Sequence, residues 1–257
     1  MKKIQTVFTD RLDRVVNLYQ DYSNNPFDPA LVHGLRVGLR ELRALFHIIN
    51  PAIQTNAYSD LNKQLRESAQ LFGTVRELDV FVELMSKIAL EEAQLSPYYY
   101  ELFHYLDIQR RKEMRRTLTN SKIELIKETL TSVKQGIESL ADHVEEQDWD
   151  EFIGQRLTKM YEKVQKNYAN LDFDNYEAVH DVRKDAKKVR YGATYFHKVT
   201  SIKTKKIRQA AKEIQDELGD YIDQQVNQHL LQDFRQRAED KEVHQALKDI
   251  EQYINKD

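Results

Sequence analysis

The chain contains no cysteine, which excludes disulfides, thiolate metal sites and a cysteine nucleophile. Glycine and proline are scarce, at 7 and 4 of 257 residues, whereas a sheet protein needs more turn residues than this. No apolar run approaches the roughly 20 residues of a membrane span, and the N-terminus lacks the apolar segment of a signal peptide. We therefore expect a cytoplasmic protein that does not enter the membrane.

Charged residues make up 32% of the chain, and Leu, Glu, Lys, Gln and Ala recur in long stretches without turn residues. Because apolar residues recur with a helical period almost from end to end, we expect an all-α fold. Pro51 is expected to end the second helix, Pro97 to open the fifth, and Gly73 and Gly219 to lie at helix ends. The predicted helices span about residues 4–22, 29–49, 57–72, 74–92, 97–117, 120–142, 149–169, 175–198, 203–218, 220–238 and 241–254.

The net charge of −3 hides a segregated distribution of charge. Residues 135–155 contain seven acids and no Lys or Arg. By contrast, residues 109–116, 183–190 and 198–208 each carry five cations against at most one acid. This pattern favours a local anion site over a uniformly basic nucleic-acid binder, although each cluster taken alone is typical of a solvated helix face.

One pattern occurs twice, 147 residues apart. The segments VHGLRVGLRELR (32–43) and VHDVRKDAKKVR (179–190) each carry a histidine followed by cations three, seven and ten positions later. Further on, LFGTVRELDV (71–80) resembles ELGDYIDQQV (217–226), with the offset shortened by one. The matched pairs are His33/His180, Arg36/Arg183, Arg40/Lys187, Arg43/Arg190, Arg66/Lys212, Gly73/Gly219 and Glu77/Asp223.

The repeated cations form a stripe along one face of a helix. Successive helical residues are rotated by about 100°, which brings the histidines and cations of the first copy within an arc of roughly 80°. This first stripe consists of His33, Arg36, Arg40, Arg43 and His47, and the second stripe consists of His180, Arg183, Lys187 and Arg190. The predicted core faces consist of Leu35, Leu39, Leu42, Phe46 and Ile49, and of Val182, Ala186, Val189, Ala193 and Phe196.

Neighbouring arginines repel one another, so either acids from other helices neutralise the stripes or a bound anion does. Glu41 is the only acid within the first stripe's own helix that could help. The candidate acids elsewhere are Glu77, Asp79, Asp216, Asp220 and Asp223. Of these, Glu77 and Asp79 are expected to orient Arg76 or Arg36.

We infer two homologous halves, residues 1–145 and 146–257, related by a pseudo-twofold axis. If the halves pack about this axis, the two stripes face a common cavity and their charges add. Guanidinium groups pair with phosphate oxygens through paired hydrogen bonds, and lysine adds a compact charge. Such a cavity suits a ligand with many evenly spaced negative charges, next to which His33 and His180 would become charged more readily.

These segments resemble the CHAD family, the conserved histidine α-helical domain. VHGLRVGLRELR is similar to its HxxRVxxRxLR signature and LFGTVRELDV to its LGxxRDxDV segment, and VHDVRKDAKKVRY and IQDELGDYID resemble the second-half segments. The resemblance covers about residues 5–235. It implies two pseudo-symmetric helical bundles around a basic central cavity, and binding of inorganic polyphosphate without established catalysis.

Carried over onto matching positions, the resemblance implies a set of polyphosphate-binding residues and no cofactor or metal. These residues are His33, Arg36, Arg40, Arg43, Arg76, His180, Arg183, Lys184, Lys187, Arg190 and Tyr191. Glu77 departs from the usual Asp of the family, and Gly34 replaces the usual acid after the first histidine. The basic run 109–116 is a candidate extension of the path, and polyphosphate granules are a candidate location.

The alternatives are a metal-dependent phosphohydrolase and a metal-chelating helical protein. Helical histidines with nearby acids can bind zinc or a di-metal centre. However, HExxH and paired Glu-x-x-His motifs are missing, and no phosphate loop or evident nucleophile is present. Nucleic acid is not expected as a partner, because Trp149 lies in the acidic stretch and no recognition motif occurs. The oligomeric state stays open.

Overall fold

The computed structural model describes residues 2–53, 57–143 and 148–254. Within these ranges the chain forms α-helices, one short 3-10 helix and no strand, so the predicted all-α class is confirmed. The elements are α1 (Lys2–Asn24), α2 (Pro29–Ile53), α3 (Ala57–Leu71), α4 (Gly73–Glu91), α5 (Tyr99–Thr117), α6 (Asn120–His143), α7 (Trp149–Ala169), α8 (Tyr176–Tyr195), the 3-10 helix η1 (Phe196–Lys198), α9 (Thr204–Arg237) and α10 (Lys241–Ile254).

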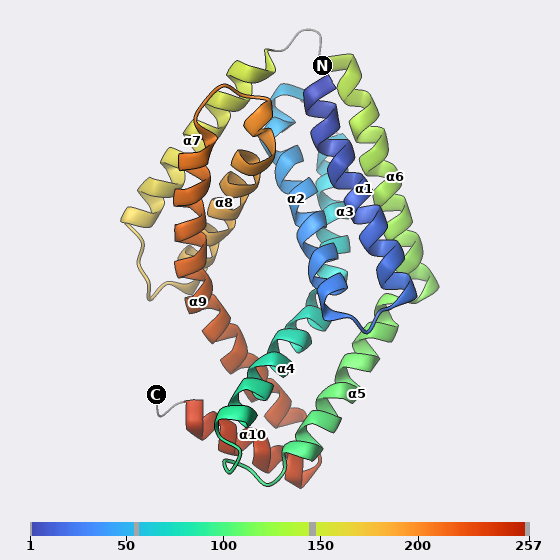
Figure 1. Ribbon diagram of the computed structural model, residues 1–257, viewed down its shortest axis with the longest axis vertical. Helices are drawn as coiled ribbons and strands as arrows, with labels where there is room; N and C mark the ends of the chain where they lie inside the picture. The colour runs from blue at the N-terminus through green and yellow to red at the C-terminus, as the bar shows by residue number, and fades with distance from the viewer. Residues whose placement is uncertain (1, 54–56, 144–147, 255–257) are drawn as a thin grey trace.

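The helices assemble into three groups, each with its own apolar core (Figure 1). The first group contains α1, α2, α3 and α6, and the first half of α7 also packs against it. The second contains α7, α8 and the first half of α9. At the other end of the long axis, α4, α5 and α10 pack with the second half of α9. The 34-residue α9 therefore links the second group to the third.

The predicted core faces of α2 and α8 are confirmed, because every predicted core position is buried. Among them, Leu42, Ile49 and Val189 have no exposed surface at all. Removing such a side chain from water stabilises the fold by about 1.5–3 kcal/mol. With these faces committed to the cores, the two cationic stripes lie on the remaining faces of α2 and α8.

Gly219 does not end a helix, contrary to the prediction. α9 runs without a break past this position. A Cβ atom at Gly219 would lie 3.3 Å from Nη2 of Arg183, a side chain of the second stripe. The glycine therefore leaves room for a guanidinium against the surface of α9, which explains an interruption of the helical pattern that is not a helix end.

Two other boundaries also differ from the prediction, whereas Gly73 lies at a helix end as predicted, as the first residue of α4. α2 continues past Pro51 to Ile53, because a proline in the last turn removes only one helical hydrogen bond. α5 begins at Tyr99, so Pro97 lies just before it. None of the helices in the described ranges combines the length and apolar character that a membrane crossing requires.

Aromatic residues from two segments of the sequence pack in or near the cores. Trp149 is buried, although it lies in an acidic stretch of sequence. Tyr98 and Tyr99 pack against the third core, whereas Tyr100 is exposed and stacks on His104 at a ring distance of 6.3 Å. The boundary predicted between residues 145 and 146 lies within 144–147, outside the described residues.

α2, α7 and α8 approach one another closely at Gly192. A Cβ atom at Gly192 would lie 2.5 Å from Cδ1 of Ile48 and 2.6 Å from Cδ2 of Leu157, both of which are fully buried. Next to this contact, Oη of Tyr195 on α8 donates a hydrogen bond to Oε1 of Glu41 on α2 at 2.5 Å. The missing side chain at Gly192 thus sets how near the two stripe-bearing helices lie.

We predict that Gly192→Ala destabilises the protein. Crowding of a packed core lowers the free energy of unfolding by about 1–3 kcal/mol. The better helix propensity of alanine offsets about 1 kcal/mol of this loss. We therefore expect the free energy of unfolding, measured by urea denaturation, to fall by up to about 2 kcal/mol.

Gly73→Ala provides the matched control, because the nearest atom to its Cβ would be 3.9 Å away. Adding Ile48→Val to Gly192→Ala removes one of the two clashing methyl groups and is expected to recover part of the loss. A Gly192→Ala variant as stable as Gly73→Ala would contradict the tight crossing.

Candidate anion-binding site

The cations of the two stripes lie close enough to affect one another's protonation. The pKa of Lys187 on α8 is lowered to about 7, first by burial and then by the positive charges of Arg183 and Arg40. His33 on α2 also experiences the charge of Lys187. Side chains from α2 and α8 therefore share one electrostatic environment, although they are almost 150 residues apart in sequence.

Arg36 and Arg183, at equivalent positions of the two stripes, form equivalent ion pairs. Nη2 of Arg36 lies 3.9 Å from Oε1 of Glu77, and Nη2 of Arg183 lies 3.4 Å from Oδ1 of Asp223. The Nε atom of each arginine is buried and has no hydrogen-bond partner. The acid partners predicted for the stripes are therefore partly present, but each guanidinium keeps unused donors.

Arg40 and Lys187 form no ion pair or hydrogen bond with any side chain in the described part of the chain. More than a third of Arg40 remains accessible, and its pKa is nevertheless lowered, mainly because surrounding protein atoms displace water from its guanidinium. Lys187 is half-buried. Glu77 and Asp223 partly offset the charges of Arg40 and Lys187 from a distance, but neither acid forms an ion pair with them. Two neighbouring cations without a direct acid partner are an arrangement that a bound anion would stabilise.

The histidines His33 and His180 have matching environments. Burial lowers the pKa of each below its usual value, and the nearest cations lower it further: Arg76 acts on His33, and Lys184 acts on His180. The ring of His180 stacks on Tyr176 with 6.1 Å between ring centroids. Both histidines are therefore neutral near pH 7, and an anion placed beside them would raise the pKa of each.

Neutral side chains hold the next arginine of each stripe. Nε of Arg43 donates to Oδ1 of Asn62 at 2.8 Å, and Nε of Arg190 donates to Oε1 of Gln215 at 2.7 Å. The Arg190 guanidinium also lies over the ring of Tyr191, 4.6 Å from its centroid. An amide orients an arginine without cancelling its charge, so these two cations remain available.

The remaining predicted binding residues have different surroundings. Tyr191 is buried, and burial raises the pKa of its hydroxyl. Lys184 is exposed and paired with Asp181 at 2.6 Å, one turn earlier on the same helix. Arg76 is half-buried and close enough to His33 and Arg36 to lower the pKa of both. Lys184 is therefore already partly neutralised, whereas Arg76 adds charge to the first stripe.

Two acids expected to serve the stripes lie elsewhere. Asp79 does not pair with Arg76 or Arg36, because Oδ1 of Asp79 accepts from Nε of Arg110 on α5 at 2.6 Å in a buried ion pair. Glu41 is buried against Tyr195 and lies 4.0 Å from Nη1 of Arg11. Both acids join helices to one another, so the stripes stay more positive than their sequence neighbours indicate.

The basic run 109–116 contributes less than its composition predicts. Arg110 is committed to Asp79. Arg111 pairs with Asp107 at 2.8 Å and Arg116 with Glu113 at 2.7 Å, both along α5. Three of the five cations in this run are therefore held in ion pairs within the protein. Of the other candidate acids, Asp216 pairs with Lys212 at 3.3 Å within α9.

Three cations that are not among the predicted binding residues lie near Arg43 and His47, at the end of the first stripe. Arg66 on α3 lowers the pKa of Arg43, and Arg156 on α7 and Lys188 on α8 lower the pKa of His47. Arg66 carried a signal, since it corresponds to Lys212 in the repeat. Arg156 carried none, because its position depends on how α7 crosses α2.

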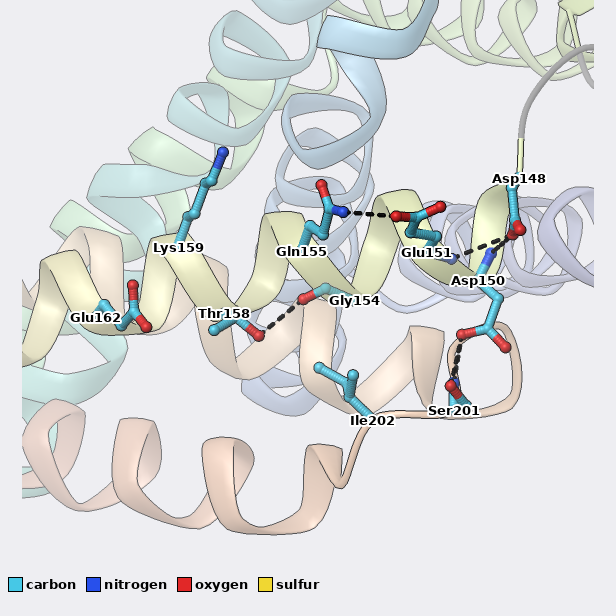
Figure 2. Close-up of a pocket in the computed structure, with 10 residues that line it drawn as sticks. All are labelled: Asp148, Asp150, Glu151, Gly154, Gln155, Thr158, Lys159, Glu162, Ser201 and Ile202. Atoms are coloured by element: carbon cyan, nitrogen blue, oxygen red, sulfur yellow. Dashed lines mark hydrogen bonds between the residues drawn. The ribbon is translucent and has the colours of Figure 1, made fainter.

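A separate cavity of about 640 Å³ lies along α7 and the segment before α9 (Figure 2). Its lining includes Asp150, Glu151 and Glu162 against a single cation, Lys159. Oδ1 of Asp150 accepts hydrogen bonds from N and Oγ of Ser201 at 2.7 and 2.9 Å. Phosphates would be repelled from this acidic surface, so it is not the candidate site.

In the described residues, no group of three or more His, Cys, Asp and Glu side chains is arranged to hold a metal ion. Several cations act on His33 and on His47 and lower the pKa of both, and such positive surroundings disfavour a bound metal ion.

Comparisons with known proteins agree with the fold. The CHAD domain family matches residues 8–232. No match was found among curated proteins. The crystal structure of the CHAD domain from the plant Ricinus communis is similar, with a TM-score of 0.76 and 19% sequence identity, covering 98% of this chain and 84% of that chain. Since the family match spans most of the sequence, this chain belongs to the CHAD domain family.

Proposed function

We propose that this protein binds inorganic polyphosphate, or a similar phosphate-rich polyanion, between α2 and α8 without turning it over. The observation that carries the proposal is the pair Arg40 and Lys187, which lie close enough for the charge of Arg40 to lower the pKa of Lys187. Neither side chain forms an ion pair in the described residues, although Glu77 and Asp223 act on them from a distance. A chain of phosphates would supply the missing negative charge at regular intervals.

The arrangement of the elements supports two repeated halves around this site. α7 begins 147 residues after α1, and α8 begins 147 residues after α2. By the shorter offset found around Gly73 and Gly219, α3 and α4 together correspond to the single helix α9. We propose that a pseudo-twofold axis relates the halves and that a central basic cavity lies between the stripes.

The contacts favour charge recognition over the recognition of shape or bases. Arg36, Arg183 and Arg43 are each held by one partner and keep other donors free. Arginines with free donors can bind successive phosphates of a repeating anion without requiring the same geometry at each phosphate. Polyphosphate binding is also what resemblance to the family implies. A cytoplasmic location, at polyphosphate granules among other places, forms part of the proposal.

We predict that Arg40→Glu combined with Lys187→Glu abolishes polyphosphate binding. The change reverses both unpaired charges, and helicity and melting temperature should stay nearly unchanged because neither side chain has an ion pair to lose. Binding of long-chain polyphosphate is measured by titration calorimetry, with circular dichroism to follow folding. The wild-type affinity should fall steeply as salt is added, because bound phosphates release counterions.

The matched control is Lys134→Glu with Lys248→Glu, which makes the same change in net charge at two exposed positions on α6 and α10. This control should bind nearly as well as wild type. Equal binding by the Arg40/Lys187 variant would refute the site, and its failure to fold would favour a purely structural role for the stripes.

We also predict that polyphosphate binding weakens as the pH rises above about 7. The pKa of Lys187 is lowered to about 7 in the free protein, chiefly by burial, and a bound polyanion would raise it toward the ordinary value. Binding then takes up a proton at alkaline pH, so affinity should fall by up to about tenfold per pH unit between roughly pH 7 and 9.

Lys187→Arg tests the source of this pH dependence, because arginine keeps its charge throughout this range. The variant should bind with a much flatter pH profile and exceed wild type at pH 9. Long chains are used so that terminal phosphates, which titrate near neutrality, contribute little. A profile as steep as that of wild type would show that another group is responsible.

Finally, we expect no turnover of the bound polymer. Incubation with long-chain polyphosphate and Mg²⁺, Mn²⁺ or Zn²⁺ should release no more orthophosphate than buffer with the same metal. Release that the Arg40→Glu/Lys187→Glu variant lacks would instead establish a metal-dependent phosphohydrolase at this site.

A further inference from the structure

A second group of polar side chains gathers where α2 runs between α3, α7 and α8. His47 on α2 forms a contact of 3.3 Å between its Nδ1 and Oη of Tyr58 on α3. The pKa of His47 is lowered to about 4, first by burial and then by the charges of Lys188, Arg156 and Arg43, while Asp185 opposes them. The group therefore combines side chains from four helices that no sequence motif connects.

Arg156 carries the charge that is least compensated in this group. Its Nε atom is buried and has no hydrogen-bond partner. Across the described ranges, none of the ion pairs involves Arg156. It lies near enough to Tyr58 and His47 to lower the pKa of both, as does Arg43. Two guanidiniums, one on α2 and one on α7, therefore lie near the same histidine and tyrosine.

A neutral His47 can donate one hydrogen bond to a ligand. Its imidazole is neutral at pH 7 because its pKa is low. Burial raises the pKa of Tyr58, so the Tyr58 hydroxyl keeps its proton. In the tautomer in which Tyr58 donates to Nδ1 of His47, the single ring proton lies on Nε2, which can donate a hydrogen bond to an oxyanion.

The one carboxylate of the group is already balanced. Oδ1 of Asp185 accepts from Nζ of Lys188 at 2.7 Å, and its Oδ2 lies 3.4 Å from Nζ of Lys163. Two lysines therefore neutralise this acid from α8 and α7. Arg43 and Arg156 remain in excess, and an anion between them would not compete with Asp185 for a cation.

This group has no counterpart in the other half of the chain. At the offset of 147 residues, Arg156 corresponds to Thr9, His47 to Thr194 and Lys188 to Glu41. Glu41 is buried and bound by Tyr195. On the side of Glu41, the buried acid lies 4.0 Å from Nη1 of Arg11, so acid and cation offset one another. On the side of His47, Arg43 and Arg156 form no ion pair in the described residues. A polyanion leaving the stripes is therefore attracted more strongly toward His47.

We propose that Arg156, His47 and Arg43 form a phosphate subsite that extends the polyanion path past α2 toward α7, on one side only. The proposal rests on the function proposed above and adds to it a direction and a terminal contact. Arg156 and Arg43 supply charge, and Nε2 of His47 supplies a directed hydrogen bond.

The test compares Arg156→Gln with Lys159→Gln, an exposed cation one turn further along α7 that has no ion pair in the described residues. Each removes one positive charge from the same helix. Arg156→Gln should weaken binding of long-chain polyphosphate by about tenfold and lower the salt slope by about one unit, as the loss of one phosphate contact requires. Lys159→Gln should leave both near wild type.

Two further measurements separate binding from folding. Arg156→Lys, which keeps the charge, should restore most of the affinity, and melting curves of all three variants should be similar. In nitrogen-15 NMR spectra, the ring signals of His47 should shift when long-chain polyphosphate is added to wild type but not to Arg156→Gln.

The outcomes distinguish this subsite from the main site. If wild type binds polyphosphate while Arg156→Gln matches Lys159→Gln and the His47 signals do not move, the subsite is overturned and the proposed function stands. If wild type binds no polyphosphate at any salt concentration, both proposals are overturned.

Discussion

Electrostatic repulsion across the α2–α8 crossing is the constraint on which the rest of this structure depends. Arg40 and Lys187 approach one another although each already has further cations beside it on its own helix. Nothing in their own chemistry favours this. The fold imposes it through apolar packing at Ile48, Leu157 and Gly192, where buried side chains worth about 1.5–3 kcal/mol each hold the helices together. The pKa of Lys187 is lowered to about 7, first by burial and then by the charges of Arg183 and Arg40, so the fold disfavours the charged form of this side chain.

The side chains that contact the stripe cations orient them without fully neutralising their charge. Arg43 and Arg190 are held by amide oxygens, which carry no charge. Arg36 and Arg183 each have one acid at 3.9 and 3.4 Å, a separation at which the attraction is weak and Nε is left without a partner. Strong buried pairing is used elsewhere, in the contact of Asp79 with Arg110 that joins α4 to α5. The molecule thus separates cations that stabilise the fold from cations that remain open to a ligand.

The two repeated segments differ at several matching positions. Glu41 and Lys188 occupy matching positions, yet Glu41 is buried against Tyr195 while Lys188 joins the cations around His47. A similar departure occurs in α9, which is continuous where α3 and α4 are separate helices. There Gly219 accommodates the guanidinium of Arg183, whereas the Cβ position of Gly73 meets only Oε1 of Glu77 at 3.9 Å. The two stripes therefore carry similar residues but lie against helices that are arranged differently.

The sequence by itself determined the all-α class, the core faces of α2 and α8, and both stripes, because helical periodicity is a local property that residues such as Leu42 and Arg40 express through spacing alone. It also matched Glu77 with Asp223, through the similar segments 71–80 and 217–226 at an offset of 146 residues. Only the tertiary structure decided which acids reach which cations: Asp79 turns to Arg110, and Arg156 comes to lie beside His47. Those contacts depend on crossing angles between helices far apart in the chain, and such angles are set by packing at small residues like Gly192, which a linear pattern does not encode.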